Sequence, residues 1–298
     1  DPDNPLTGQV WYNETANTLK YFYNNPGAWA TGGVLNTARR LLAGAGTQTA
    51  ALAFGGGPPF TAITESYNGT SWTEVNDLNT ARRQLAGAGT NTAALGFGGY
   101  NPTLPVSPIA NTESWNGTNW TEVNDLNTAR SRLAGAGIQT AALAFGGDPS
   151  TAVTETWNGT NWTEVNDLNT ARRELAGAGT NTAALAFGAS PSLALTESWN
   201  GTNWTEVNDL NTGRGALGGV GVDNTSALAF GGEGPAVTGA TESWNGTNWT
   251  EVADLGTARY ALAGAGIQTA ALAFGGQPSG TLTEEWNSGP ATVTITTD

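Results

Sequence analysis

The chain contains 298 residues, and its 25 acidic side chains outnumber 11 basic ones, which gives a formal net charge of -14. It has no Cys and no His, which excludes disulfides, thiol chemistry and metal sites built on these residues. The negative charge repels nucleic-acid phosphates, and no apolar run approaches the roughly 20 residues of a membrane-spanning helix. We therefore expect no nucleic-acid partner, no membrane insertion, no metal and no cofactor. The absence of Met indicates a piece of a longer product.

The N-terminal part of the chain differs from the remainder. Residues 1–8 are polar and contain Pro, so they are predicted to form a linker. Residues 9–33 hold three short aromatic or β-branched runs, around Trp11, Tyr21–Tyr23 and Trp29, separated by Asn, Gly and Pro. These runs predict three strands. Their spacing matches that of the later repeats, so residues 9–33 are interpreted as a diverged partial repeat that begins at the second strand.

Residues 34–298 consist of six copies of one motif and a closing strand. An L-x-T-x-R start recurs at intervals of 42 to 48 residues, and its arginines are Arg39, Arg82, Arg130, Arg172, Arg214 and Arg259. Periods of about 40–50 residues with a Gly pair and a Trp are typical of β-propellers. We therefore predict an all-β fold in which residues 9–298 form a single propeller domain.

Each full copy contains four candidate strands, which the fourth copy illustrates. The first, near Glu174–Gly179, has side chains small enough for strands that crowd around an axis. The second, Thr182–Gly188, is continuously apolar, as expected of a strand covered on both faces. The third and fourth, near Leu193–Trp199 and Asn203–Asn208, flank Asn200-Gly201, a strong hairpin signal.

The number of blades follows from how the chain ends pair. The tail at 291–297 is a further β-branched strand, and the predicted strands fall one short of seven complete blades. We therefore prefer seven blades, one of them composed of strands from the termini. The alternative is six blades. Trp286 precedes Ala291 by the interval that separates Trp199 from Trp204, so the tail would be the sixth copy's own fourth strand and residues 9–33 a cap.

The repeat resembles the kelch motif: an Arg, a small-residue strand, an apolar strand ending in Gly-Gly, and two aromatic residues. In the second copy these are Arg82, Phe97, Gly98-Gly99, Trp115 and Trp120. The fourth copy departs from the pattern with Gly188-Ala189. Residues 8–30 also resemble short modules of phage tail fibres and other virion proteins. Together these resemblances imply a kelch-like propeller used as a virion or extracellular binding or structural part.

The repeated residues have a structural interpretation and a functional one. An Asp precedes five of the repeat arginines by five residues, which predicts Arg–Asp pairs between connectors; the alternative is an Arg ring at the channel mouth that binds an anion. The fourth-strand tryptophans are predicted to pack between blades, with a sugar-stacking shelf as the alternative. They are Trp72, Trp120, Trp162, Trp204 and Trp249. The repeated Glu residues pair as in glycosidases, but a catalytic site needs one asymmetric constellation.

The copies differ most in the loops after their second strands: residues 55–62, 98–110, 146–152, 188–194, 231–240 and 275–281. Because strand direction alternates, these loops share one face with the connectors into the innermost strands. Loops on a rigid scaffold concentrate binding residues. The predicted ligand-binding residues are Tyr100, Asn101, Thr103, Asp148, Glu233 and Gln277.

We expect a non-enzymatic binding or structural module, located on a virion or outside the cell. Its expected partner is a glycan or a protein at a cell surface or within a virion, and it is expected to form a homo-oligomer as part of a fibre. The alternatives are a carbohydrate-active enzyme on a propeller scaffold and a spacer without a ligand.

Overall fold

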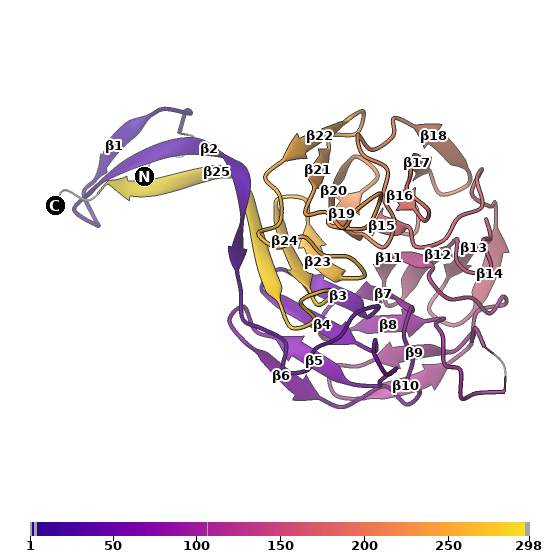
Figure 1. Ribbon diagram of the computed structural model, residues 1–298. Helices are drawn as coiled ribbons and strands as arrows, with labels where there is room; N and C mark the ends of the chain where they lie inside the picture. Colours follow the sequence, from indigo (N-terminus) through magenta and orange to yellow (C-terminus); the bar gives the residue numbers. More distant parts are fainter. Residues whose placement is uncertain (1, 3–4, 106, 296–298) are drawn as a thin grey trace.

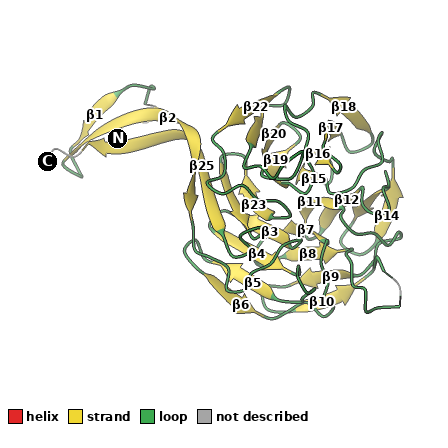
Figure 2. Ribbon diagram, viewed as in Figure 1, coloured by secondary structure: helices red, strands yellow, loops and turns green. Residues whose placement is uncertain are grey.

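The computed structural model describes residues 2, 5–105 and 107–295, which form 25 β-strands. Five four-stranded antiparallel sheets and one five-stranded sheet are arranged as blades around a central channel (Figure 1). No helix appears among the described residues (Figure 2). Parts of the expected linker 1–8 and of the expected strand 291–297 lie outside them.

The strands of the first five blades follow chain order from the channel outward. Blade 1 contains β3 (Ala43–Thr47), β4 (Ala50–Phe54), β5 (Thr64–Tyr67) and β6 (Trp72–Val75). Blade 2 contains β7 (Ala86–Gly89), β8 (Ala94–Phe97), β9 (Thr112–Trp115) and β10 (Trp120–Val123). Blade 3 contains β11 (Ala134–Ile138), β12 (Ala141–Phe145), β13 (Thr154–Trp157) and β14 (Trp162–Val165). Blade 4 contains β15 (Ala176–Gly179), β16 (Ala184–Ala189), β17 (Leu193–Trp199) and β18 (Trp204–Val207). Blade 5 contains β19 (Gly218–Asp223), β20 (Ser226–Phe230), β21 (Thr241–Trp244) and β22 (Trp249–Val252).

Blade 6 combines both ends of the chain. It contains β23 (Ala263–Ile267), β24 (Ala270–Phe274), the first part of β25 (Thr283–Ile295) and the last part of β2 (Thr18–Thr31). Trp29 lies opposite Trp286, as Trp204 lies opposite Trp199 in blade 4. The N-terminal segment therefore supplies the outermost strand of the last blade and closes the ring.

The preferred count of seven blades is wrong, and the alternative of six is confirmed. The tail does not form the fourth strand of blade 6, because that place is taken by residues 28–31 of β2. The rest of β2 instead pairs with the second part of β25 and with β1 (Val10–Asn13). These three segments form a sheet that projects from the ring (Figure 1), which we call the extension.

The innermost strands lie close enough together that side chains larger than Ala are mostly excluded. A Cβ atom on Gly44 would lie 2.6 Å from the carbonyl oxygen of Gly264 and 2.6 Å from the Phe274 ring, both in blade 6. This explains the small residues of the first strand in every copy. In the fourth copy the predicted bounds of the third strand are confirmed, and those of the other three agree within two residues.

The hydrophobic core lies between neighbouring blades. Phe54 of blade 1 packs against Trp120 of blade 2, with ring centroids 4.8 Å apart. The Trp120 indole N–H donates to Thr64 Oγ1 of blade 1 at 3.0 Å. The same contact recurs at every seam, and at the closing one Trp29 donates to Thr241 Oγ1 at 3.1 Å. Each fourth-strand Trp thus joins its blade to the preceding one by burial and by one hydrogen bond.

Candidate functional site

The repeat arginines are buried inside the blades rather than exposed at the channel mouth. Each forms an ion pair with the Glu of its own third strand, and none of the six is more than 2% exposed. The pairs, at 2.5 to 3.1 Å, are Arg39–Glu65, Arg82–Glu113, Arg130–Glu155, Arg172–Glu197, Arg214–Glu242 and Arg259–Glu284. The alternative of an anion-binding Arg ring is therefore wrong.

The predicted Arg–Asp pairs are also wrong, because the aspartates have another partner. Asp77 Oδ1 accepts the backbone N–H of Thr64 at 3.0 Å and so fixes the start of the third strand. Asp125, Asp167, Asp209 and Asp254 do the same in their blades. Each buried guanidinium instead pairs with a carboxylate that is buried beside it, the Glu of the third strand in the same blade. Burial lowers the pKa of Arg130 to about 10, which leaves it charged at neutral pH opposite Glu155.

The five predicted structural tryptophans are at most 5% exposed, between blades. They offer no open ring face for a sugar. The repeated carboxylates of the third strands are likewise occupied: Glu65 accepts the backbone N–H groups of Asn36 and Thr37 besides the Arg39 guanidinium. The shared arginines, third-strand glutamates and tryptophans therefore form a closed layer. Among the residues that differ between blades, several lie at the surface.

Six such residues surround one mouth of the channel, one from each blade, two positions after the repeat Arg. We call them the mouth ring: Leu41, Gln84, Arg132, Glu174, Ala216 and Ala261. All six have positive φ, between 51° and 60°, a conformation that non-Gly residues adopt only when the surroundings impose it. Here a closed circle of backbone hydrogen bonds imposes it: each N–H donates to the carbonyl of the preceding blade at 2.7 to 2.9 Å.

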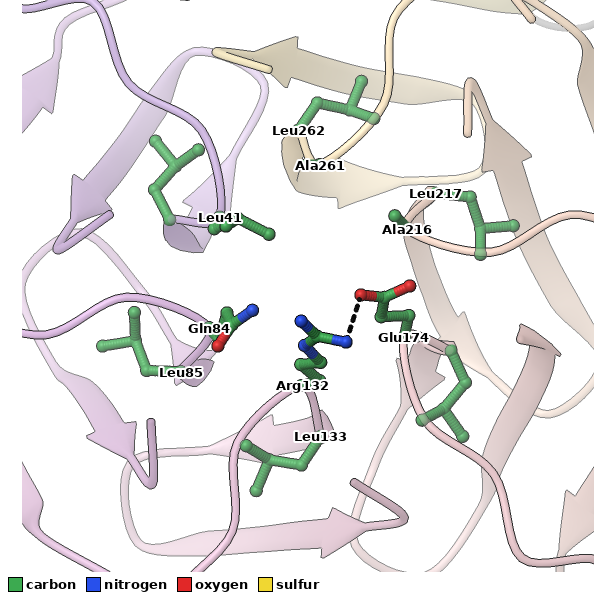
Figure 3. A pocket seen from close by; sticks show the side chains of 12 residues that line it. Leu41, Gln84, Leu85, Arg132, Leu133, Glu174, Ala216, Leu217, Ala261 and Leu262 are labelled. Atoms are coloured by element: carbon green, nitrogen blue, oxygen red, sulfur yellow. Dashed lines mark ion pairs between the residues drawn. The ribbon is translucent and has the colours of Figure 1, made fainter. Parts of the chain in front are cut away.

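The side chains of the mouth ring divide it into two halves (Figure 3). Arg132 and Glu174 form an ion pair at 3.1 Å. With its amide oxygen turned toward Arg132, Gln84 accepts from Arg132 Nε at 2.8 Å. The other half carries only Leu41 and two alanines. The space between them is about 90 Å³, room for about three water molecules, so a larger ligand would lie across the mouth rather than enter it.

A second set of varying residues, the outer ring, follows the Gly pairs. It consists of Gly57, Tyr100, Asp148, Ser190, Glu233 and Gln277, each joined by a backbone bridge to the residue after a repeat Arg. Four predicted ligand-binding residues, Tyr100, Asp148, Glu233 and Gln277, therefore lie at equivalent places on the same face as the mouth ring. The loops and the connectors do share one face, as predicted.

Two other predicted residues shape the long loop of blade 2. Asn101 is 5% exposed; its Nδ2 donates to the Ala81 carbonyl at 2.7 Å, and its Oδ1 accepts from Thr103 N and Oγ1. Thr103 itself is exposed. Asn101 thus ties the loop to its blade. Val106 of the same loop lies outside the described residues.

The outer ring contacts residues that the sequence analysis did not single out. Arg83 covers the ring of Tyr100 at 5.5 Å, Arg173 forms an ion pair with Asp148 at 2.6 Å, and Tyr260 donates to Gln277 at 3.2 Å. These residues directly follow repeat arginines. Their variation from copy to copy is the sequence signal that identifies them, although the loops vary more.

One cavity on this face is large enough for an organic ligand. It lies at the seam between blades 6 and 1 and has a volume of about 420 Å³, within the range of about 300–1,000 Å³ found for small-molecule sites. We call it the seam pocket. Arg40 and Gln277 line it with polar groups, and Ala38, Pro58 and Pro278 with apolar ones. Gly57 has no side chain to fill it.

Within the part of the chain that the structure describes, no helix is long and apolar enough to cross a membrane.

Comparisons with known proteins identify the fold and no activity. No protein-family model matches the chain, and no curated protein matches it. Among 481 matching chains of solved structures, the structure of YjhT superimposes with a TM-score of 0.69 at 12% identity, over 90% of this chain and 98% of that one. At this identity the match shows the propeller fold alone, and such folds serve many functions. The kelch and tail-fibre resemblances are not confirmed by these comparisons.

Proposed function

We propose that this propeller is a binding module that recognises its partner through the face formed by the mouth ring and the outer ring. One observation carries this proposal: the varying residues of the mouth ring and the outer ring converge from all six blades on one face, whereas the repeat arginines, their glutamate partners and the fourth-strand tryptophans are mostly buried. Ion-paired, cationic, amide and aromatic groups there come from different blades. Such an asymmetric surface on a symmetric scaffold favours recognition over a uniform spacer.

The partner class that we propose is a glycan or a protein, met on a virion or in an extracellular assembly. Polar and aromatic groups such as Tyr100, Asp148 and Glu233 suit hydroxyl-rich or peptide surfaces. The N-terminal resemblance to tail-fibre modules supports the location. Glu65 and its five counterparts are held in buried ion pairs, which supports a role without catalysis.

The test is a glycan array and a pull-down with the full chain and two multiple variants. The first combines Tyr100→Ala, Asp148→Ala, Glu233→Ala and Gln277→Ala. The matched control combines Ile138→Ala, Val222→Ala and Ile267→Ala, exposed residues at the opposite mouth. We expect the first variant to lose binding and the second to keep it, with circular dichroism confirming that both fold. The reverse pattern, or equal loss in both, would contradict the proposal.

A second role, as part of a homo-oligomer, is favoured by the extension. Its register places Val10, Tyr21 and Val293 in one cross-strand row and Tyr12, Leu19 and Ile295 in the next. Directly opposed side chains point to the same side, so these six residues share one face, and each is 37% to 55% exposed. Exposed apolar patches of this kind mark interaction sites.

We propose that this face binds the same face of a second copy. Glu14 and Lys20 are the charged residues among 8–31 and 287–295, and they cancel, so the net charge of -14 belongs to the rest of the chain. Two copies can meet through this neutral sheet while their acidic propellers stay apart. Sedimentation of the full chain should reveal a dimer or larger oligomer that Leu19→Glu with Val293→Glu converts to monomer. A wild-type monomer at all concentrations would exclude it.

A further inference from the structure

Arg40 stands apart from the other arginines of the described chain. Eight arginines form ion pairs with carboxylates, and Arg83 covers the ring of Tyr100. Arg40 has no carboxylate partner and only a long contact from Nη1 to the Tyr260 hydroxyl, 3.4 Å. A guanidinium in a part-buried place without an anion leaves strong donors unused.

Another seam shows what this position binds when an anion is present. Arg173 of blade 4 is equivalent to Arg40 of blade 1, because each directly follows a repeat Arg. Across the seam to blade 3, Arg173 Nη1 pairs with Asp148 Oδ1 at 2.6 Å. The residue equivalent to Asp148 at the seam between blades 6 and 1 is Gln277, which is neutral and lines the seam pocket together with Arg40. The protein's own carboxylate is therefore replaced at this seam by an amide beside a cavity.

We propose that the seam pocket binds the carboxylate of a small organic acid, with Arg40 as its cationic partner. The ligand carboxylate would take the place that Asp148 occupies beside Arg173. Gln277 Oε1 already accepts from the Tyr260 hydroxyl at 3.2 Å, which leaves its amide N–H₂ group to donate to the ligand. Ala38, Pro58 and Pro278 provide apolar surface for the rest of the acid.

The volume and the charge set limits on the ligand. About 420 Å³ accommodates a ring-sized acid but not an oligosaccharide or a folded peptide. One guanidinium and one amide match a planar, singly charged carboxylate, which accepts two parallel hydrogen bonds from an arginine. This inference rests on the proposed binding role of the face and narrows it to one pocket and one chemical group.

Benzoate and benzamide form a matched pair of probes, because they share shape and differ in charge. We would titrate each into ¹⁵N-labelled full chain and follow the Arg40 Nε–Hε signal with the backbone amides of Gly57, Gly276 and Gln277. Benzoate is expected to give saturable shifts at these positions, and benzamide to bind at least ~10-fold more weakly, since it lacks the charge that strengthens the hydrogen bonds.

Two variants and one control test the assignment to Arg40. Arg40→Gln should weaken benzoate binding at least ~10-fold. Gln277→Asp should abolish it, because the new carboxylate would pair with Arg40 as Asp148 pairs with Arg173. Arg173→Gln, at the seam already filled by Asp148, should leave binding unchanged. Equal shifts with benzamide, unchanged binding in Arg40→Gln or Gln277→Asp, or no saturable shift would overturn the proposal. None of these results depends on the array and pull-down, so the two proposals can fail separately.

Discussion

The buried layer of the blades and the face around the channel mouth follow opposite rules within the same repeat. Arg130 and Arg132 lie two residues apart. Arg130 belongs to the layer that all six copies share and is fully buried with Glu155, whereas Arg132 belongs to the varying mouth ring, where its side chain is 31% exposed and that of Glu174 is 21% exposed. At these two positions, the residue that every copy shares holds its blade together, and the residue that varies reaches the surface.

The largest expected effect comes from a substitution in the buried layer. Arg130→Ala removes a guanidinium that donates to Glu155 and to the Ala144 carbonyl, which leaves a carboxylate buried without its counterion. Such a loss costs about 3–5 kcal/mol of the free energy of unfolding. Arg132→Ala is the matched control two residues away, and an exposed pair of this kind contributes about 0–1 kcal/mol. Denaturant unfolding followed by tryptophan fluorescence measures both. Similar losses in the two variants would mean that burial does not separate the layers.

A somewhat smaller loss of stability is expected in blade 6, where the N-terminal strand β2 completes the buried layer. Trp29→Ala removes ring contacts to Phe230 and Trp286, with centroids 5.2 and 5.5 Å away, and the hydrogen bond to Thr241. Because the Trp29 side chain is only partly buried, we expect a loss of about 3 kcal/mol, at the low end for Trp→Ala. Tyr12→Ala in the extension, 55% exposed, should change stability by less than about 0.5 kcal/mol. Equal thermal unfolding of the two variants would argue against closure by the N-terminal strand.

The strands of blades 1–5 were predictable from the sequence because each copy of the motif forms one blade. Each strand therefore pairs with the strand next to it in the chain. The closure was not predictable. The interval from Trp286 to Ala291 equals the interval between the third-strand and fourth-strand aromatic residues of the other copies. It does not determine which segment of the chain pairs with the edge of β25. Residues 28–31, more than 250 positions away in sequence, occupy that edge. The pairing of distant segments depends on the finished ring, which a local pattern does not contain.

The candidate site was predictable in part for a similar reason. Loop variation pointed to Tyr100, Asp148 and Gln277, which do lie on the mouth face. The mouth ring was missed because its left-handed backbone is imposed by hydrogen bonds between blades on residues such as Leu41 and Glu174, which have no sequence preference for it. Arg40 was missed because its role depends on what faces it across a seam.

The smallest expected effect concerns a third-strand position that is Trp in every blade except blade 1. Tyr67 replaces that Trp in blade 1, and its hydroxyl donates to Glu285 of blade 6 at 2.6 Å, where the other blades carry Ser or Thr. Burial, with the hydrogen bond to Glu285, raises the pKa of Tyr67 from 10.0 to about 12. The unfolded chain thus loses this proton at lower pH than the folded protein does. The stabilisation is fully present below pH 10 and is lost as the pH rises through about 12.

Tyr67→Phe should therefore cost about 1.5 kcal/mol at neutral pH, and the gap between the variant and the wild-type protein should close between pH 10 and 12. Tyr23→Phe, on a Tyr of the extension, is the control for deletion of a hydroxyl away from this seam and should change the free energy of unfolding at neutral pH by less than about 0.5 kcal/mol. Urea unfolding at a series of pH values measures the difference directly. The titration of Arg130, whose pKa is about 10, is common to the two proteins and cancels in their difference. A gap that stays constant up to pH 12 would mean that Glu285 does not hold the Tyr67 proton, and that this hydrogen bond does not stabilise the seam between blades 6 and 1.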